Sequence, residues 1–232
     1  AEIEIAIIKL PRISNFSDLD PFYNESSIQI RWVEPGKELG NPDLLIIPGS
    51  KQTIKDLESL NKSGLTKQIK YYANNGGSIF GICGGLQMLG MKLKDPYSRE
   101  NNKESDSTAE SKGMQLLPIE TTFQKKKNTS QRKEKIAWPA FESVNGFEMH
   151  YGESNLLKNI TNNVKPLFHK GSLGWVIEKK DKSFIGGTYL HGIFDNGKWR
   201  RTLINKIRAR KGLKKLSVNE ENNSEKRDRL LD

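Results

Sequence analysis

The chain has 232 residues, a length that fits one α/β domain or one domain with appendages. Its 38 Lys and Arg exceed its 28 Asp and Glu by 10, and this positive net charge allows a nucleic-acid or other acidic partner. A single cysteine excludes an internal disulfide, which indicates a cytoplasmic protein. No signal peptide is visible and no apolar run approaches the roughly 20 residues that span a bilayer, so we expect neither export nor membrane contact.

Strand-like and helix-like segments alternate along the first third of the chain. Strands are expected over residues 3–9, 27–33 and 43–47, and helices over residues 53–60 and 65–74. Gly76-Gly77 ends the second helix, as C-terminal glycines do. This alternation predicts an α/β fold, a three-layer α/β/α sandwich with a mostly parallel, mixed central sheet.

The second half of the chain is more polar and its strands are shorter. Strands are expected over residues 114–123, 147–151, 175–178 and 184–189, and a helix over residues 196–211. Two polar segments, 97–112 and 124–135, are interpreted as surface loops inserted in a domain that covers 1–211. Residues 212–232 are expected to form a polar tail with a weak helical end.

The pattern around Cys83 is typical of a nucleophile on a tight strand-to-helix turn. An apolar run ends at Cys83, with Gly81 before it and Gly84 and Gly85 after it. Small neighbours permit the strained turn, which leaves the next backbone N–H and the start of a helix facing the reacting atom. A buried structural cysteine between two packed elements is the alternative.

A thiol nucleophile needs a base, and the chain has three histidines. His191 ends a strand-like segment, which places it at a sheet edge where α/β active sites form. His150 lies between glycines, whereas His169 has little context and is interpreted as a surface or hydrogen-bonded residue. One Cys and three widely spaced His match no usual metal-ligand pattern, so we expect no metal site.

A strand that ends at Pro48-Gly49-Ser50 offers another free backbone N–H. This stretch lacks the spacing of a phosphate-binding P-loop. The N–H of Gly49 or Ser50 could form an oxyanion hole together with that of Gly84. An ordinary turn explains the residues equally well.

Residues 81–90 resemble the nucleophile elbow of the class I, triad-type glutamine amidotransferases, which have a flavodoxin-like fold. Further stretches are similar to the C-terminal glutaminase domain of the cobyric acid synthase family. They are residues 10–21, 47–57, 113–123, 146–152 and 187–196. Among these, the Leu-Pro-Arg-Ile-Ser-Asn-Phe stretch from Leu10 is the most specific, because many amidotransferases share the elbow.

The resemblance implies that Cys83 attacks the side-chain amide of L-glutamine and that His191 activates the thiol and protonates the departing ammonia. It further implies that the backbone N–H groups of Gly84 and Gly49 hold the oxyanion. Contacts with glutamine would come from Gln87, Gly85 and His150.

In the family, ammonia passes to an ATP-dependent synthetase domain or subunit. That partner amidates carboxylates of the corrinoid adenosylcobyrinic acid a,c-diamide in cobalamin biosynthesis. ATP and Mg²⁺ are expected there, so no cofactor is expected in this chain. The N-terminal synthetase domain is absent from the sequence, which is interpreted as a fragment or a separate subunit.

One departure from the class concerns the third member of its triad. Where many class I enzymes have His-x-Glu, Ile193 stands two residues after His191. We therefore expect a Cys–His dyad, with the imidazole oriented by a backbone carbonyl, Glu148 or Glu153.

Two other functions are weighed against this one. A related glutaminase subunit could serve another acceptor, such as a peptidoglycan precursor, and an amidotransferase-like module could lack activity. Intact Cys83 and His191 argue against the second. Nucleic-acid binding rests on net charge alone and ranks last, because no aromatic residues interleave the basic run Lys125-Lys126-Lys127, which is expected to be a solvated loop.

Overall fold

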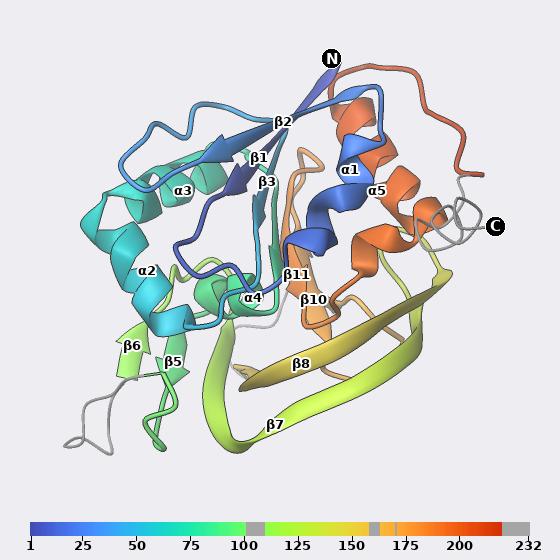
Figure 1. Cartoon of the computed structure of the whole chain (residues 1–232). Helices are drawn as coiled ribbons and strands as arrows, with labels where there is room; N and C mark the ends of the chain where they lie inside the picture. The colour runs from blue at the N-terminus through green and yellow to red at the C-terminus, as the bar shows by residue number, and fades with distance from the viewer. Residues whose placement is uncertain (101–109, 158–162, 170, 220–232) are drawn as a thin grey trace.

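Seven strands form a central sheet in the order β2-β1-β3-β4-β11-β10-β9 (Figure 1). The computed structural model describes residues 1–100, 110–157, 163–169 and 171–219. Strands β2, β1, β3, β4 and β11 are mutually parallel, and β10 is antiparallel to β11 and to β9. The strands are β1 (Ile3–Ile8), β2 (Ile28–Val33), β3 (Leu44–Ile47), β4 (Ile79–Ile82), β9 (Val164–Pro166), β10 (Gly174–Glu178) and β11 (Phe184–Thr188).

Helices cover both faces of this sheet, with α2, α3 and α4 on one side and α1 and α5 on the other (Figure 1). The prediction of a three-layer α/β/α fold with a mostly parallel, mixed sheet is confirmed. The helices are α1 (Asp20–Tyr23), α2 (Thr53–Lys62), α3 (Leu65–Asn74), α4 (Gly84–Leu89) and α5 (Gly197–Arg210), and the 3-10 turns are η1 (Phe16–Leu19) and η2 (Ile193–Asp195).

The central strands are apolar throughout because both of their faces are covered. All residues of β3, β4 and β11 are buried. On one face of β4, a Cβ atom at Gly81 would meet the backbone carbon of Gly85 at 2.6 Å, so α4 packs directly on the strand. On the other face, the ring of Phe80 lies 5.8 Å from that of Phe194 and 5.7 Å from that of Trp199.

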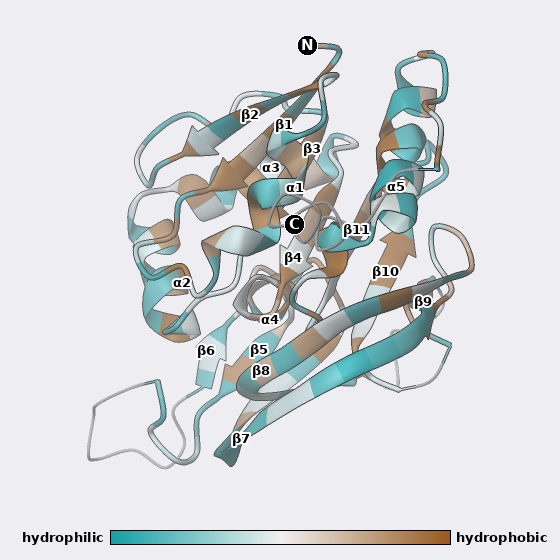
Figure 2. Ribbon diagram, turned by 45° about the vertical axis from the view of Figure 1, so that its right-hand side comes forward, coloured by the Kyte–Doolittle hydropathy of each residue, from teal (hydrophilic) through white to brown (hydrophobic). Residues whose placement is uncertain are grey.

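A second sheet, in the order β6-β5-β7-β8, lies beside the carboxyl ends of the central strands (Figures 1 and 2). Our interpretation of residues 124–135 as a loop is wrong, because the whole segment belongs to β7 and residues 128–135 pair with β8. Burial alternates along most of this strand and its exposed positions are charged or polar, so it has the polarity of a loop (Figure 2). The strands are β5 (Lys92–Lys94), β6 (Glu110–Lys112), β7 (Ile119–Ile136) and β8 (Glu142–Leu156).

A bulge interrupts the pairing of β7 with β8. Phe123 lies opposite Gly152, but the next pair joins Asn128 to His150, so β7 advances five residues while β8 advances two. The three extra residues of β7 fall within Gln124–Lys127. The basic run that we expected in a solvated loop is therefore part of a bulge in a strand.

The remaining sequence-based expectations are met in part. The strand expected over 114–123 begins at Ile119, and of the loop expected over 97–112 the last three residues form β6. Residues 101–109, within that loop, and the helical end expected near residues 229–231 lie outside the described residues. No helix in the described part of the chain is long and apolar enough to cross a membrane.

Candidate functional site

Cys83 lies on the turn between β4 and α4, with a backbone φ of +49°. A positive φ is unusual for a residue with a side chain, and such strain persists where the surrounding structure enforces it. Here the N–H of Cys83 donates to the carbonyl of Thr188 at 2.7 Å, which ties the turn to the end of β11. The thiol is 5% exposed and its Sγ lies 3.9 Å from the carbonyl oxygen of Met149.

His191 follows β11 and receives a carboxylate partner from the other end of the chain. Its Nδ1 donates to Oδ2 of Asp18 at 2.7 Å, and the backbone N–H of Gly192 donates to Oδ1 of Asp18 at 2.8 Å. Asp18 and His191 are 2% and 1% exposed. This contact fixes the tautomer that leaves Nε2 available to the thiol, and Nε2 has no nitrogen or oxygen partner among the described residues.

Burial opposes a charged imidazole, but the hydrogen bond with Asp18 and the neighbouring Cys83 outweigh burial and raise the pKa of His191 to about 10. The imidazole of His191 is therefore protonated at neutral pH. A protonated imidazole beside a thiol is able to give its proton to a departing amine.

Phe147 of β8 covers the face of the His191 imidazole. The two rings stack with centroids 5.1 Å apart and 17° between their planes. The backbones pair as well, because Phe147 N–H donates to the His191 carbonyl at 3.1 Å and His191 N–H donates to the Phe147 carbonyl at 2.9 Å. The second sheet thus holds the imidazole of His191 in place and shields it from water.

The expectation of a dyad oriented by Glu148, Glu153 or a carbonyl is wrong. Glu148 instead accepts from His150 and Arg132, and Glu153 accepts from Gln124. Sequence reasoning missed Asp18, although it lies within residues 10–21, a stretch that carried part of the resemblance. A signal existed: the connection after β1 leaves the same carboxyl edge of the sheet as Cys83 and His191.

Gly49 lies against the reacting pair. A Cβ atom there would meet Cε1 of His191 at 3.1 Å and Cβ of Cys83 at 3.6 Å. A Cβ atom on Gly84 would meet the backbone nitrogen of Ser50 at 2.8 Å. The loop after β3 and the first residue of α4 therefore meet beside the thiol, which is the place an oxyanion hole requires.

A cavity of about 250 Å³ opens in front of Cys83. Two of the residues expected to contact glutamine, Gln87 and His150, line it. Gly85 is not among its lining residues and packs against the carbonyl of Ile47 at the end of β3 and that of Pro48 after it. The lining residues are Ser14, Ser50, Lys51, Thr53, Cys83, Gln87, Glu100, Phe123, Lys127, Met149, His150 and Tyr151.

The amide of Gln87 is held by two buried hydroxyls. Its Oε1 accepts from Oγ1 of Thr53 at 3.1 Å, and its Nε2 donates to the hydroxyl of Tyr189 at 3.2 Å. The Tyr189 hydroxyl also lies 2.6 Å from Oγ of Ser154 in β8. Because Tyr189 follows β11, this chain of hydrogen bonds joins the central sheet to the second sheet beneath the cavity.

His150 is fixed from both of its ring nitrogens. Nδ1 donates to the carbonyl of Gly152 at 2.7 Å, Nε2 lies 2.9 Å from Oε2 of Glu148, and the ring stacks on Tyr189 at 4.0 Å. Burial alone would raise the pKa of Glu148, but hydrogen bonds from His150 and Arg132 lower it. His150 is therefore a rigid wall of the cavity.

Opposite charges lie at two points of the cavity wall. Glu100 is 7% exposed, and its Oε2 accepts from the backbone N–H of Ile54 at 3.3 Å in the first turn of α2. Burial is the main cause that raises the pKa of Glu100 to about 7. Lys127, from the bulge of β7, also lines the cavity, and its ammonium group lies 5.8 Å from the centre of the Tyr151 ring. Sequence reasoning missed both residues, because each lies in a segment interpreted as a loop.

His169 lies outside this site, with its ring 6.1 Å from that of Phe141. Among the described residues, no group of three His, Cys, Asp or Glu side chains could hold a metal ion.

Comparison with known proteins adds sequence relatives and structural neighbours. The sequence profile of the CobB/CobQ-like glutamine amidotransferase domain matches residues 4–199. A cobyric acid synthase of Prochlorococcus marinus (strain NATL2A) is 68% identical over 232 residues, which are 100% of this chain and 46% of that protein. Another, from Prochlorococcus marinus (strain MIT 9313), is 49% identical over 231 residues and again 46% of its length is covered. The chain thus spans about half the length of these relatives.

Solved structures share the fold at low sequence identity. PurLQS from Thermotoga maritima gives a TM-score of 0.59 at 13% identity, with 90% of this chain and 97% of that chain covered. A glutamine amidotransferase crystal structure gives 0.58 at 13% identity, with 81% and 89% covered.

Proposed function

Because the chain belongs to the CobB/CobQ-like glutamine amidotransferase domain family, we propose that it hydrolyses the side-chain amide of L-glutamine with Cys83 as nucleophile and His191 as acid and base. The observation that carries this proposal is the buried contact between Asp18 and His191 beside the strained Cys83. Such an arrangement of thiol, imidazole and carboxylate is the general triad of acyl transfer.

In the first half of the reaction, the Cys83 thiolate adds to the amide carbon of glutamine. The backbone N–H groups of Gly84 and Gly49 stabilise the resulting oxyanion. His191 gives its proton to the amide nitrogen, the C–N bond breaks, and ammonia leaves a thioester on Cys83. Asp18 stabilises the imidazolium that donates this proton.

In the second half, a water molecule gives a proton to the neutral His191 and its oxygen adds to the thioester carbon. The C–S bond then breaks, glutamate leaves and the thiolate is restored. Phe147 keeps the imidazole buried, so the proton moves between ring and substrate rather than to bulk solvent.

The cavity suits a zwitterionic amino acid. Glu100 would bind the α-ammonium group and Lys127 the α-carboxylate, which leaves the side-chain amide directed at Cys83. Gln87 and His150 would contact the substrate from the walls. Gly85 has a packing role in this scheme, because it lies under Pro48 rather than along the cavity.

The relatives support a place in cobyric acid synthesis, since their names are those of cobyric acid synthases. We assign the ammonia to ATP-dependent amidation of adenosylcobyrinic acid a,c-diamide, in a synthetase domain or subunit that binds ATP and Mg²⁺. The same relatives favour the corrinoid acceptor over a peptidoglycan precursor. The amidotransferase domain would cover 1–211, and the single cysteine supports a cytoplasmic location.

An electrophilic glutamine analogue tests the assignment of the nucleophile. It should label the protein once, and Cys83→Ser should abolish labelling, because the chain has no second thiol. His191→Ala should remove glutaminase activity measured with the synthetase partner, whereas His169→Ala, at an exposed histidine, should retain it. Labelling that persists in Cys83→Ser contradicts the proposal, and activity retained in His191→Ala would transfer the role of base to His150.

A further inference from the structure

We propose that a basic and aromatic surface at the opening of the catalytic cavity binds an acidic face of the ATP-dependent synthetase region. This mouth patch consists of Tyr97, Arg99, Lys125, Lys126, Met149 and Tyr151. The inference rests on the proposed function, because it assigns the surface across which the ammonia made at Cys83 would leave.

Exposed apolar side chains mark this surface. Tyr97, Met149 and Tyr151 are 44%, 37% and 37% exposed, and they are three of the seven large hydrophobic side chains exposed in the described part of the chain. Met149 and Tyr151 also line the catalytic cavity. Tyr and Met are enriched at protein interfaces, where they bury apolar area beside polar groups.

Cations lie over the two tyrosine rings. The Lys125 ammonium is 4.9 Å from the centre of the Tyr97 ring, and the Arg99 guanidinium is 5.6 Å from that of Tyr151. An N–H of Arg99 also donates to the backbone carbonyl of Lys125 at 2.7 Å, which joins the two pairs. The structure gives Arg99, Lys125 and Lys126 no carboxylate partner among the described residues, so their charge faces outward.

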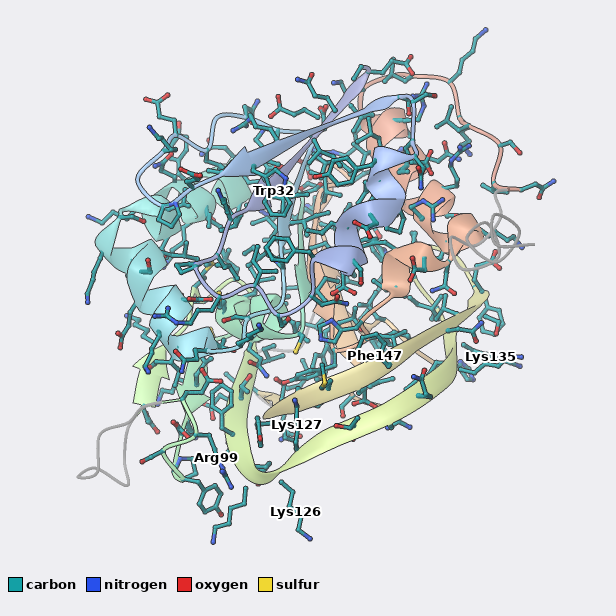
Figure 3. The ribbon with its side chains drawn as sticks, in the orientation of Figure 1. Trp32, Arg99, Lys126, Lys127, Lys135 and Phe147 are labelled. Atoms are coloured by element: carbon teal, nitrogen blue, oxygen red, sulfur yellow. The ribbon has the colours of Figure 1, made fainter. Side chains whose placement is uncertain are left out.

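The bulge of β7 places these cations at the opening. Lys125 to Lys127 occupy the stretch in which β7 carries three residues more than β8 (Figure 3). Figure 3 shows Lys127 on the side of the ribbon that faces β8 and Lys126 on the outer side. One short segment therefore supplies a cation to the cavity wall and others to the rim around it.

The chemistry of ammonia argues for a protein surface as the occupant. Ammonia that escaped into water at neutral pH would become ammonium, which is not a nucleophile, so the site that uses it must cover the opening. The chain spans 46% of its relatives' length, which leaves more than half of such a protein to provide that cover. Positive charge on the rim selects an acidic face, and the interleaved apolar side chains favour a protein over a small anion.

The test compares two double variants in the protein that contains both this chain and its synthetase region. Lys125→Glu/Lys126→Glu reverses two rim charges, and neither residue is among those that line the cavity. Lys180→Glu/Lys182→Glu makes the same change of charge at two exposed residues in the turn before β11, at the end of the strand opposite Cys83. Amidation is measured with glutamine and, separately, with ammonium chloride as nitrogen donor.

The rim variant should lower glutamine-dependent amidation about tenfold, raise the glutamate formed per amide, and leave ammonia-dependent amidation unchanged. The control variant should match the wild type in all three. Lys125→Arg/Lys126→Arg keeps both charges and should therefore retain the coupling of glutamine hydrolysis to amidation. Added salt should weaken this coupling in the wild type. These two measurements test the proposal even if the charge-reversed protein does not fold.

Unchanged coupling in the rim variant, or equal losses in both double variants, overturns the proposal. A raised KM for the corrinoid in the ammonia-dependent reaction also overturns it, because the patch would then bind the acceptor itself. These failures leave single, Cys83-dependent labelling by a glutamine analogue intact, whereas failure of the proposed function removes that labelling.

Discussion

The central sheet and the β7–β8 hairpin contribute to the same cavity but differ in composition. Strands β3, β4 and β11 are fully buried and almost entirely apolar, whereas β7 has buried positions near its start and exposed, largely charged positions after them (Figure 2). The central sheet presents Cys83 and His191 at the ends of neighbouring parallel strands. The hairpin contributes the carbonyl of Met149 beside the thiol and the ring of Phe147 over the imidazole.

This difference separates two requirements of catalysis. Reacting groups must be held within fractions of an ångström, and a close-packed sheet does this because its side chains cannot move independently. Substrate and partner recognition needs charges and aromatic rings that reach solvent, which a half-exposed hairpin offers. We therefore expect changes at the carboxyl edge of the central sheet to alter kcat, and changes in the outer wall of the cavity to alter KM or coupling.

Asp18→Asn should have the largest effect among the variants that retain both Cys83 and His191. An asparagine amide can donate to Nδ1 of His191, which favours the tautomer with the proton on the nitrogen that faces Cys83. The contact that raises the pKa of His191 is also lost. We expect kcat to fall by about 10³-fold with little change in KM for glutamine. Steady-state kinetics check this, and Asp20→Asn, at an exposed carboxylate two residues later, should behave as the wild type.

A normal kcat in Asp18→Asn would show that the backbone pairing of Phe147 with His191 suffices to orient the base. In that case the β7–β8 hairpin, rather than the central sheet and the connection after β1, would position the proposed base.

The residues of this triad differ in how far the sequence predicts them. Cys83 and His191 could be predicted because an apolar strand, a small residue and a functional group follow one another locally. Asp18 pairs with a histidine 173 residues away, and no local pattern reports such a contact. Ile193 pointed to a missing carboxylate, and the chain supplies one from the connection after β1 instead.

The hairpin was mistaken for a loop for a physical reason. Strand propensity depends on what a pleated surface packs against, and the second half of β7, although paired with β8, has few buried positions. Its run of Lys, Arg, Asn and Ser therefore resembles a solvated loop. Glu100 and Lys127, two charged residues of the cavity wall, lie in the two segments that were interpreted as loops. The sequence therefore did not predict that either residue lines the cavity.

Glu100→Gln should have an intermediate effect, on KM rather than kcat. Glu100 binds an ammonium group only when ionised, and burial raises its pKa to about 7. In the wild type, KM for glutamine should therefore rise as the pH falls from 8 through 7 to 6. Glu100→Gln should raise KM about tenfold at pH 8 and abolish this pH dependence. Kinetics between pH 6 and 8 measure both effects.

Glu153→Gln is the control, because Glu153 is exposed and not among the cavity-lining residues. If the slope of KM with pH persists in Glu100→Gln, Glu100 acts only as an acceptor at the first turn of α2. The α-ammonium group would then need another partner.

Tyr189→Phe should have the smallest effect and compares the two regions most directly. The hydroxyl of Tyr189 joins Gln87 of α4 to Ser154 of β8, so its loss frees the Gln87 amide on one side. We expect KM to rise about threefold and the free energy of unfolding to fall by about 1 kcal/mol. Tyr72→Phe is a matched change, because that buried hydroxyl donates within the core to the carbonyl of Pro42 at 3.0 Å. Tyr72→Phe should lower the free energy of unfolding by a similar amount, measured by urea unfolding, and leave KM unchanged. Equal KM values in the two variants would show that the Tyr189 hydroxyl does not hold the Gln87 amide in position for the substrate.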